Sequence, residues 1–463
     1  MVVGSGAAGG WVAKELCERG ASVLVLEAGR ALDPARDFPD PPPPRRPLLD
    51  RVLAVARGQG VQARSAAFNS RTARLFVNDR ENPYTAPRDM PFNWYRARQV
   101  GGRMHVWARV APRFSERELE GWPLGRADLD PYYERAEAFM GVRPVVRTAA
   151  EEAFAERVGP DRFVPVPVAA REELGGFSPL DAAQATGHLT LRPDSVVREV
   201  LSDGVEYVDR VTRERRRATA PLVFLCASAF ETLRIMLASR IGNSSGLLGR
   251  GVVDHVVTGI GGPHPGGSAE PEEPYSAAGA TGLFLPVGEP RFGVQGGIGR
   301  GPSWYMLAHG RMDVREDNVL TLDPRRTDRW GMPVVHVECE HSAGDAALAA
   351  EQLDVMRDLA AAGGLTVRSP PSGKLLDSLA YRLARRRLLT RSGAFVPGTA
   401  LHEMGGAPMG TDPATSVVDT HGRCWDAPNV VVADGAAFPA GCWRNTTLTI
   451  VALAIRAAER AAG

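Results

Sequence analysis

The chain of 463 residues is long enough for about two or three domains and for a large apolar core that needs neither disulfides nor metals. Hydrophobic residues make up 44% of it and charged residues 24%, the composition of an ordinary globular protein. The 55 basic residues balance 54 acidic ones to a net charge of +1, which argues against a surface built to bind nucleic acid or an anionic membrane.

The cysteines and the apolar runs exclude further classes of protein. Five scattered cysteines without a paired spacing predict neither a disulfide framework nor a zinc site. No apolar run approaches the ~18 residues of a membrane-spanning helix. No signal peptide is expected, because a glycine-rich stretch already begins at Gly4. We therefore expect a protein of the reducing cytoplasm.

The first residues predict a strand–helix–strand unit. Met1–Val3 has the apolar residues of a buried strand, Gly4–Gly10 is a glycine-rich turn, and Trp11–Arg19 has the apolar spacing of a helix. Ala21–Leu26 predicts a second buried strand, which Glu27 closes. This arrangement is typical of an α/β fold with a parallel sheet.

The rest of the chain predicts further elements in order. Expected are a Pro- and Arg-rich loop at 32–47, a loop at 82–107, two short helices within 113–140, short strands between 189 and 225, and a helix at 227–239. Short strand-like runs punctuated by Gly and Pro predict an antiparallel sheet over about 256–340. Helices follow at 345–362 and 375–389, then a buried strand at 430–432 and a final helix at 446–462.

The turn after the first strand has the spacing of a dinucleotide-binding loop. Gly4, Gly6 and Gly9 form G-x-G-x-x-G between a strand and a helix, where glycines allow a tight turn, close approach of a pyrophosphate and close helix packing. Glu27 follows about 20 residues on, where a carboxylate accepts hydrogen bonds from ribose hydroxyls. An acid there favours FAD or NAD over NADP. A purely structural glycine turn is the less favoured interpretation.

Several longer segments resemble one family. LEAGR at Leu26–Arg30 resembles flavoproteins, and RARQVGGRMHVWARV at Arg96–Val110, HEMGGAPMGTDPATSVVD at His402–Asp419 and PNVVVADGAAFPAGCWRNTTLTI at Pro428–Ile450 resemble the glucose–methanol–choline (GMC) oxidoreductases. Within that family, the segments 82–102 and 226–239 are similar to bacterial sugar and glycoside oxidases of the pyranose oxidase and C-glycoside 3-oxidase type.

The resemblance implies the fold and its division along the chain. It implies an α/β protein with a Rossmann-like FAD-binding domain of the GMC type and an α+β substrate domain with an antiparallel sheet. The FAD-binding domain is expected to comprise 1–145, 189–255 and 401–463, the substrate domain 256–400, and a connecting segment 146–188.

The resemblance also implies FAD as the cofactor and a set of residues around it. Asp434 and Gly435 are expected beside the ribityl chain and pyrophosphate, Val197 at the adenine, and Gly101 and Gly102 on the isoalloxazine side. The full set of implied cofactor residues is Gly4, Gly6, Ala7, Ala8, Gly9, Glu27, Gly101, Gly102, Val106, Val197, Ala227, Asp434, Gly435, Asn445, Thr446 and Leu448.

His402 and Asn445 match the family's two active-site positions, the second of which is His or Asn. Alcohol oxidation by hydride transfer to flavin N5 needs a base for the hydroxyl proton, and neutral His serves at pH 7. An amide then donates to the oxygen as its negative charge grows. The helix that begins at Thr446 would turn its positive dipole end toward the flavin. Taken alone, His402 would be read as a core or capping histidine, and Asn445 also suits a helix N-cap.

The sequence departs from the family at several points. Some members carry FAD covalently on a His five residues after the first glycine of the pair, which here is Val106, with His105 one residue early; we therefore predict non-covalent FAD. Phe163–Gly187 is short and cysteine-free compared with related proteins. Pro408, Trp443-Arg444 and Thr446 replace the usual residues near the flavin, which we expect to affect substrate choice or redox potential.

These observations predict an FAD-dependent oxidation of a CH–OH group on a sugar, glycoside or cyclitol-like alcohol, with His402 as the base. The alternatives are a non-redox lyase of the hydroxynitrile-lyase kind, a non-catalytic flavin-binding remnant and, less favoured, an NAD-dependent dehydrogenase. The electron acceptor (oxygen, a quinone or a carrier protein) and the oligomeric state stay open. His105, His255 and His421 do not match the catalytic positions, whereas any one of His309, His336 and His341 could line the pocket.

Overall fold

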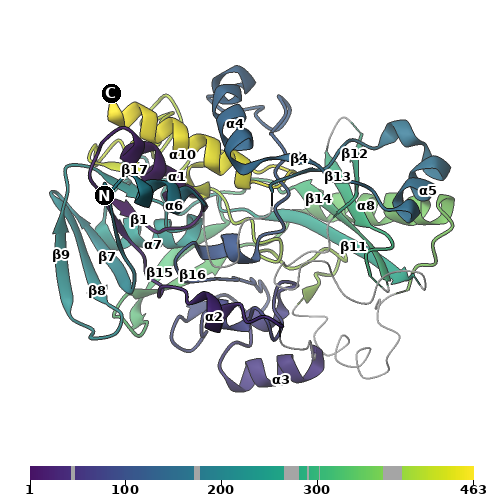
Figure 1. Ribbon diagram of the computed structural model, residues 1–463, viewed down its shortest axis with the longest axis horizontal. Coiled ribbons are helices and arrows are strands. Elements are labelled where there is room, and N and C mark those ends of the chain that lie inside the picture. Colours follow the sequence, from purple (N-terminus) through teal and green to yellow (C-terminus); the bar gives the residue numbers. More distant parts are fainter. Residues whose placement is uncertain (43–46, 171–177, 265–280, 289–290, 302, 369–387) are drawn as a thin grey trace.

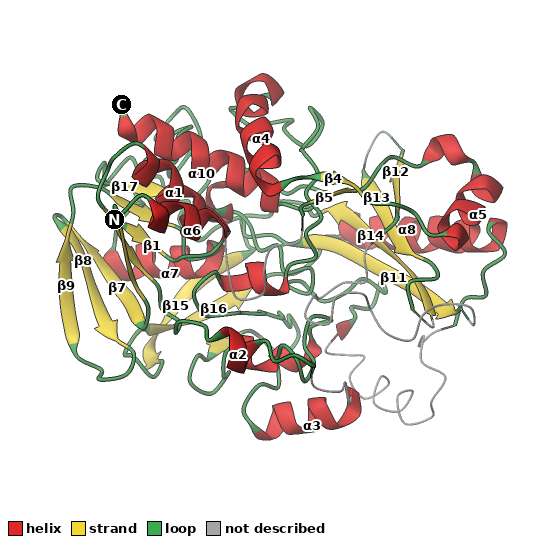
Figure 2. Ribbon diagram, in the orientation of Figure 1, coloured by secondary structure: helices red, strands yellow, loops and turns green. Residues whose placement is uncertain are grey.

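A computed structural model of the protein describes residues 1–42, 47–170, 178–264, 281–288, 291–301, 303–368 and 388–463. Two regions lie side by side along the long axis of the molecule, one around a parallel sheet and the other around an antiparallel sheet (Figure 1). Both chain ends belong to the region of the parallel sheet. Figure 2 shows the strands of both sheets with helices packed around them.

The parallel sheet gathers strands from all along the chain. Its order is β17-β10-β1-β2-β6, and every neighbouring pair is parallel. The strands are β1 (Val2–Val3), β2 (Val23–Leu26), β6 (Leu189–Arg192), β10 (Val223–Leu225) and β17 (Val430–Val432). Almost every residue in the three central strands is apolar and buried, as expected of a parallel sheet covered on both faces. Segments more than 400 residues apart in the sequence therefore share one sheet.

Helices lie around this sheet. They are α1 (Ala7–Glu18), α4 (Arg126–Met140), α6 (Ser178–Ala185), α7 (Ala229–Ser239) and α10 (Thr447–Ala462). α1 packs directly on β1, β2 and β10 and also against α10 and α6, and α10 packs against α4. α7 packs against β7 of a second sheet, the antiparallel β7 (Ser195–Leu201), β8 (Gly204–Asp209) and β9 (Arg215–Thr219). The first and last helices of the chain thus bury one another, which joins the two ends of the protein.

The other region is built on a four-stranded antiparallel sheet of order β11-β14-β13-β12. Its strands are β11 (His255–Pro263), β12 (Leu283–Val287), β13 (Phe292–Gly297) and β14 (Ser303–Arg311). Helix α8 (Ala343–Ala362) covers one face, where Gln352 exchanges hydrogen bonds with Thr258 and the carbonyl of Val256. Because side chains alternate across a strand, His255 and Val257 lie on the opposite face, away from α8.

The remaining elements are short or connect the two regions. A fourth sheet has the order β15-β16-β3, with β15 (Val319–Thr327), β16 (Pro333–Glu338) and β3 (Tyr84–Thr85), and β4 (Arg143–Pro144) pairs with β5 (Pro167–Val168). The other helices are α2 (Pro34–Asp37), α3 (Pro47–Ala56), α5 (Ala149–Val158) and the 3-10 turns η1 (Gln62–Arg64), η2 (Ala73–Leu75), η3 (Gly102–Val106), η4 (Pro160–Arg162) and η5 (Gly435–Ala437).

The predicted α/β fold with an antiparallel second sheet is confirmed, with local differences. The first helix begins at Ala7 rather than Trp11, so Gly9 lies inside its first turn. The two helices expected within 113–140 are one helix, α4, preceded by turns. The strands expected over 256–340 form two sheets instead of one. Most of the helix expected at 375–389 lies outside the described residues.

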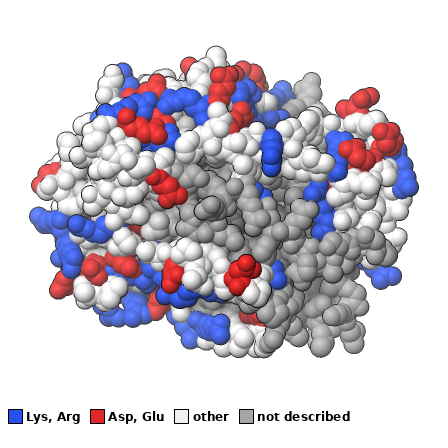
Figure 3. Space-filling model, viewed as in Figure 1, with Lys and Arg blue, Asp and Glu red and all other residues white. Residues whose placement is uncertain are grey.

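Charged side chains of both signs are interspersed on the face of the molecule that Figure 3 shows. This agrees with the net charge of +1, which gives no single-sign field for steering a polyanion.

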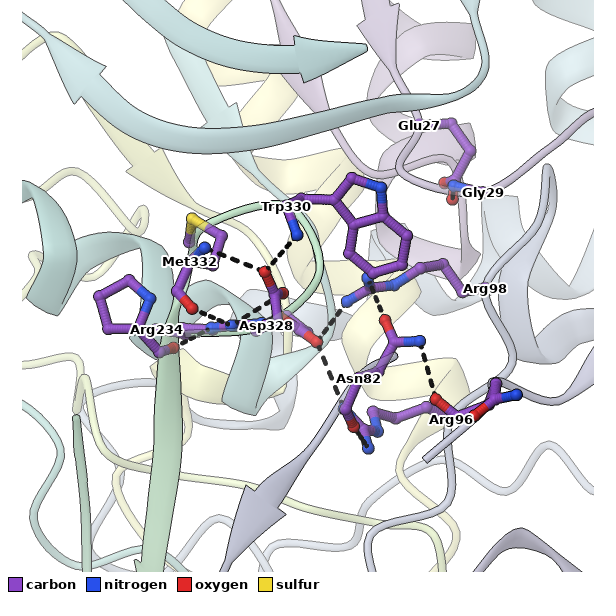
Figure 4. A network of polar contacts seen from close by, with 12 residues as sticks. Glu27, Gly29, Asn82, Arg96, Arg98, Arg234, Asp328, Trp330 and Met332 are labelled. Carbon is purple, nitrogen blue, oxygen red and sulfur yellow. Dashed lines mark hydrogen bonds and ion pairs between the residues drawn. The ribbon is translucent and has the colours of Figure 1, made fainter. Parts of the chain in front are cut away.

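A buried polar network fastens α7 to the turn between β15 and β16 (Figure 4). Arg234 donates from Nη2 to Asp328 Oδ2 at 3.0 Å and from Nε to the carbonyl of Pro333 at 2.8 Å. Asp328 Oδ1 accepts from the backbone N–H groups of Trp330 and Met332 at 2.8 and 2.9 Å. Both charged side chains of the ion pair are shielded from solvent, so each depends on the other for compensation.

The same network extends to the loop that carries the predicted flavin segment. Arg98 donates to Glu231 Oε1 and to Asn82 Oδ1, both at 2.6 Å. Burial alone would raise the pKa of Glu231, but Arg98, Arg234 and Arg96 lower it to about 2. The network therefore holds an ionised carboxylate between three guanidinium groups and connects the 82–98 segment to α7.

Breaking the central pair is expected to destabilise the protein strongly. Arg234→Met leaves Asp328 buried without its partner, which typically costs about 3–5 kcal/mol of unfolding free energy. Urea denaturation followed by fluorescence measures this loss. The control Arg357→Met removes an exposed ion pair on α8 and should leave the midpoint nearly unchanged. Equal midpoints for the two variants would show that the network does not hold α7 in place.

Candidate active site

The glycine-rich loop between β1 and α1 is built by close backbone contacts. A Cβ on Gly9 would lie 1.9 Å from the carbonyl oxygen of Gly4, so only glycine fits at this point of α1. A Cβ on Gly6, the N-cap of α1, would meet no atom within 4 Å. No side chain caps this helix, and no acidic residue lies in its first turn. The N–H groups at its start, from Ala7 and Ala8 on, are therefore suited to an anionic ligand.

Glu27 lies beside this loop at the end of β2. Its Oε2 accepts from the backbone N–H and the hydroxyl of Ser5 at 2.9 and 2.7 Å, and its Oε1 accepts from the N–H of Gly29 at 2.7 Å. Burial raises the pKa of Glu27, and the hydrogen bonds oppose that rise. Oε1 has a second lone pair, so the group can accept from a hydroxyl of a ligand as well.

The glycine pair at 101–102 meets the same loop from another part of the chain. Gly101 has φ of +83°, in the left-handed region that glycine adopts readily, and its N–H donates to Ser5 Oγ at 3.1 Å. A Cβ on Gly102 would lie 3.4 Å from the Cα of Gly6, so the two backbones run close together. The structure thus brings the two glycine segments and Glu27 to one place.

His105 and Val106, the residues around the position of covalent attachment, are both engaged elsewhere. His105 Nε2 lies 2.8 Å from the carbonyl of Val100, and its ring packs near Phe38. Val106 is buried in an apolar cluster that also contains Phe38 and Tyr95. This arrangement is in keeping with non-covalent cofactor binding, which stays a prediction.

The ends of β10 and β17 complete the rim of the loop. A Cβ on Gly4 would lie 2.5 Å from the carbonyl oxygen of Cys226 and 3.0 Å from the Cα of Ala227. The N–H of Ala227 donates to Thr232 Oγ1 at 3.2 Å, and Thr232 Oγ1 donates to Asp434 Oδ2 at 2.6 Å. Burial raises the pKa of Asp434 to about 6. Ala227 and Asp434 are therefore linked through one hydroxyl group of α7.

Two other predicted cofactor residues lie at the edges of this arrangement. Val197 is buried in β7, the strand whose first residue, Ser195, donates its N–H to the carbonyl of Glu27 at 2.8 Å. The carbonyl of Gly435 accepts from the N–H of Gly405 at 2.9 Å. This second bond attaches the segment that follows His402 to the end of β17.

The segment that carries His402 is held in a costly backbone conformation. Leu401 has φ of +62°, which is unfavourable for a bulky side chain. Arg103 donates to its carbonyl and to Glu403 Oε2, both at 2.8 Å. Met404 and Val253 pair their backbones as an antiparallel bridge. These contacts fix the backbone on both sides of His402.

His402 does not stand alone. Its Nδ1 lies 2.8 Å from Nε2 of His255, whose Nδ1 lies 2.7 Å from the carbonyl oxygen of Cys442. The two rings are nearly perpendicular, with centroids 4.9 Å apart. His255 is 1% exposed, whereas His402 is half-buried. The sequence predicted no role for His255, so its contact with His402 adds a residue to the expected site.

Asn445 is also held by a residue of the antiparallel sheet. Gln295 Nε2 on β13 donates to Asn445 Oδ1 at 2.9 Å. The amide oxygen of Asn445 is thereby used, which leaves its Nδ2 hydrogens for a ligand. Thr446 is the buried residue at the start of α10, and the side chain of Leu448 is fully buried, so Leu448 offers a ligand only its backbone.

One face of the antiparallel sheet supports both predicted catalytic positions. His309 on β14 lies opposite Val257 on one side and Gly293 on the other, so it shares a face with His255 and Gln295. A Cβ on Gly293 would lie 2.3 Å from the Trp443 ring, which packs directly on the strand. His402 and Asn445 therefore meet the same sheet face, one through His255 and one through Gln295.

The electrostatics of this cluster keep its histidines neutral. Burial first, and then the nearby His255, His309 and Arg103, hold the pKa of His402 well below its ordinary value. Burial lowers the pKa of His255 to about 4 and that of His309 to about 3. Neutral imidazole is the form that accepts a proton.

The sequence missed the residues that support the site because their partners are remote. His255 and His402 are 147 positions apart, and Gln295 and Asn445 are 150 apart. The one available signal was the position of His255 inside a segment that resembles the family. His309 was expected only as one of three histidines that could line the pocket. Of the other two, His336 lies 2.8 Å from Thr85 Oγ1 in the β15-β16-β3 sheet.

Two kinds of feature are absent from the part of the chain that the structure describes. None of its groups of His, Cys, Asp and Glu is arranged to hold a metal ion. None of its helices combines the length and the apolarity needed to cross a membrane.

Known proteins resemble this chain in sequence and in fold. Residues 314–454 match the GMC oxidoreductase family. The chain is 25% identical to the 2-methyl-1,2-propanediol dehydrogenase of Mycolicibacterium austroafricanum, over 99% of this chain and 94% of the relative, and 25% identical to the C-glycoside 3-oxidase of Arthrobacter globiformis, over 100% and 94%. Its fold resembles the crystal structure of pyridoxine 4-oxidase from Mesorbium loti, with a TM-score of 0.67 at 18% identity over 99% and 98% of the two chains.

The C-terminal part of the chain matches the GMC oxidoreductases, and the comparisons support an FAD-dependent oxidoreductase that acts on CH–OH donors. The residues present fit FAD. The uncapped start of α1 suits its pyrophosphate, the Glu27 carboxylate suits ribose hydroxyls, and the close approach of Gly102 to Gly6 leaves no side chain between the two glycine segments.

Behind the histidine pair lies a pair of buried carboxyl groups. Asp254 Oδ2 accepts from the N–H groups of Gly398 and Ala400 at 2.7 and 3.1 Å, while its Oδ1 has no hydrogen bond among the described residues. Burial first, and then the charge of Glu403, raise the pKa of Asp254 to about 7. Folding therefore favours the protonated form of this side chain.

The raised pKa predicts a pH-dependent effect of Asp254→Asn. A carboxyl whose pKa rises from 3.8 to about 7 on folding contributes stability at low pH that is lost as the pH rises through about 7. The variant removes this loss, so its melting temperature relative to wild type should increase between about pH 5 and pH 8. The control Asp354→Asn, on the exposed face of α8, should show a constant difference. A constant difference for Asp254→Asn as well would contradict the burial of an unpaired carboxyl.

Proposed function

We propose that the protein oxidises a CH–OH group of a sugar, glycoside or cyclitol-like alcohol, with His402 as the base and Asn445 as the hydrogen-bond donor to the reacting oxygen. The observation that carries the proposal is the pairing of His402 and Asn445 with one sheet face, through His255 and Gln295. The low pKa of His402 keeps it neutral, and Gln295 holds the amide oxygen of Asn445, which leaves the amide hydrogens of Asn445 for a ligand.

The cofactor and the side chains of the protein have separate roles in the proposed reaction. Bound FAD supplies the acceptor for the hydride that leaves the alcohol carbon. His402 removes the hydroxyl proton, which requires the neutral imidazole that the low pKa provides. Asn445 donates to the oxygen as negative charge develops on it. Helix α10 begins two residues later without an acidic residue in its first turn, so its N-terminal N–H groups favour negative charge nearby.

The substrate class rests on the relatives. One acts on a diol by its name and another on a glycoside, and both names describe oxidation of an alcohol. The Gln295 amide and the stacked rings of Phe284 and Trp443, with centroids 5.7 Å apart, lie at the sheet face that supports the catalytic pair. We propose that this face forms one wall of the pocket for a polyhydroxylated ring.

Removing the base tests the proposal. His402→Ala should still bind FAD but should slow anaerobic flavin reduction at least ~100-fold, the usual scale for loss of a general base. Stopped-flow absorbance measures the rate with 2-methyl-1,2-propanediol, D-glucose, D-fructose, myo-inositol and a phenyl glucoside. His188→Ala changes an exposed histidine that is distant from His402 in the sequence. It is the matched control and should react like wild type. An unchanged rate of flavin reduction in His402→Ala would contradict the assignment of His402 as the base.

The low pKa of His402 predicts the pH profile of the same reaction. An ordinary histidine has a pKa of about 6.5, so its base form would be half lost at that pH. Because the pKa of His402 lies well below this value, the base form persists, and the flavin reduction rate should stay level between about pH 8 and pH 6. A profile that falls to half its plateau near pH 6.5 would contradict the neutral cluster.

A further inference from the structure

We propose that His255 is a positioning residue that fixes the tautomer of His402, so that Nε2 of His402 is always the unprotonated, proton-accepting nitrogen. This rests on the proposed function, in which His402 is the base. The argument follows one chain of hydrogen bonds from the backbone at Cys442 through both imidazole rings.

The first bond decides the tautomer of His255. A carbonyl oxygen can only accept, so the 2.7 Å contact with Cys442 requires that His255 Nδ1 carry a hydrogen. A neutral imidazole has one hydrogen, which leaves Nε2 of His255 as an acceptor. His255 is 1% exposed, and its ring neighbours are His309 and His402. Neither of these two rings offers it a compensating negative charge. Its neutral form is therefore the one that the site favours.

The second hydrogen bond determines the tautomer of His402. Since His255 Nε2 accepts, His402 Nδ1 at 2.8 Å must donate, and its one hydrogen is then on Nδ1. Nε2 of His402 is left with its lone pair. When His402 takes up the hydroxyl proton at Nε2, its Nδ1–H still points at an acceptor, so the positive imidazolium keeps a hydrogen bond that stabilises it.

The backbone holds the two rings in this register. An isolated antiparallel bridge pairs Val253, two residues before His255, with Met404, two residues after His402, so the two segments lie side by side. Arg103, paired with Glu403, is a positive charge that acts on His402, and His309 and the backbone contact of His341 lie next to His255.

A histidine that only fills the core would also be buried, so the test needs a response that packing alone does not give. His255→Leu removes the acceptor while keeping an apolar side chain of similar size. His255→Gln keeps an oxygen at about the reach of Nε2. His402→Ala, with and without His255→Leu, shows whether the effect of His255 acts through His402.

The kinetic arm measures anaerobic flavin reduction, using the alcohol of the panel above that reduces the wild-type flavin fastest. His255→Leu should bind FAD and slow the limiting rate at least ~10-fold, less than loss of the base itself. The apparent dissociation constant of the alcohol should change by no more than about twofold, and His255→Gln should recover to within about threefold of wild type. The double variant should be no slower than His402→Ala. Independent, multiplicative losses would overturn the proposal.

The second arm needs no substrate, and its decisive observation is made on the wild-type protein. The ¹⁵N spectrum of the wild-type holoenzyme, labelled at histidine, distinguishes protonated from unprotonated ring nitrogens, and His402→Ala assigns the signals. We expect Nδ1 of both His402 and His255 to be protonated at pH 7.5. A protonated Nε2 on His402 would overturn the proposal whatever the kinetics. If flavin reduction is slow in His402→Ala but normal in His255→Leu, the role of His255 is wrong and the proposed function stands. If flavin reduction is normal in His402→Ala, the proposed function itself is wrong.

Discussion

The architecture depends on the central strand of the parallel sheet, β1, which is only two residues long and pairs with β2 on one side and β10 on the other. Parallel strands present their carboxyl ends at one edge, and ligands of open α/β sheets bind there. Gly4 follows β1, Glu27 follows β2, Cys226 follows β10, and Asp434 follows shortly after β17. Four segments separated by hundreds of residues thereby form one cradle.

The same edge anchors the predicted catalytic segment. The N–H groups of Gly405, Ala407 and Met409 donate to the carbonyls of Gly435, Ala436 and Ala437 at 2.9, 2.9 and 3.0 Å. On its other side the segment pairs with Val253, just before β11 of the antiparallel sheet. His402 is thus fixed between the region of the parallel sheet and the region of the antiparallel sheet, and neither sheet alone would define its position. The buried cluster around it carries a cost, because Asp254 and the strained Leu401 are stabilised only by their surroundings.

The sequence predicted the parts of this arrangement that depend on local spacing. Gly4, Gly6, Gly9 and Glu27 follow a short-range rule, and the structure brings them together as that rule implies. The segment resemblance identified the family and pointed to His402 and Asn445. The supporting residues escaped because cross-strand contacts leave no periodic signal. Gln295 reads as one polar residue of a glycine-rich strand, and the Arg234–Asp328 pair joins a helix to a turn that is 94 residues away.

The most direct measurement is an anaerobic titration of the purified holoenzyme with polyhydroxylated alcohols, followed by the absorbance of the oxidised flavin. Our account predicts a yellow protein whose oxidised-flavin band disappears with at least one sugar, glycoside or cyclitol. Readmission of oxygen or addition of a quinone then restores the band and identifies the acceptor. A bound flavin that stays oxidised with every alcohol, while the protein is folded, would contradict alcohol oxidation and leave a non-redox role for the cofactor.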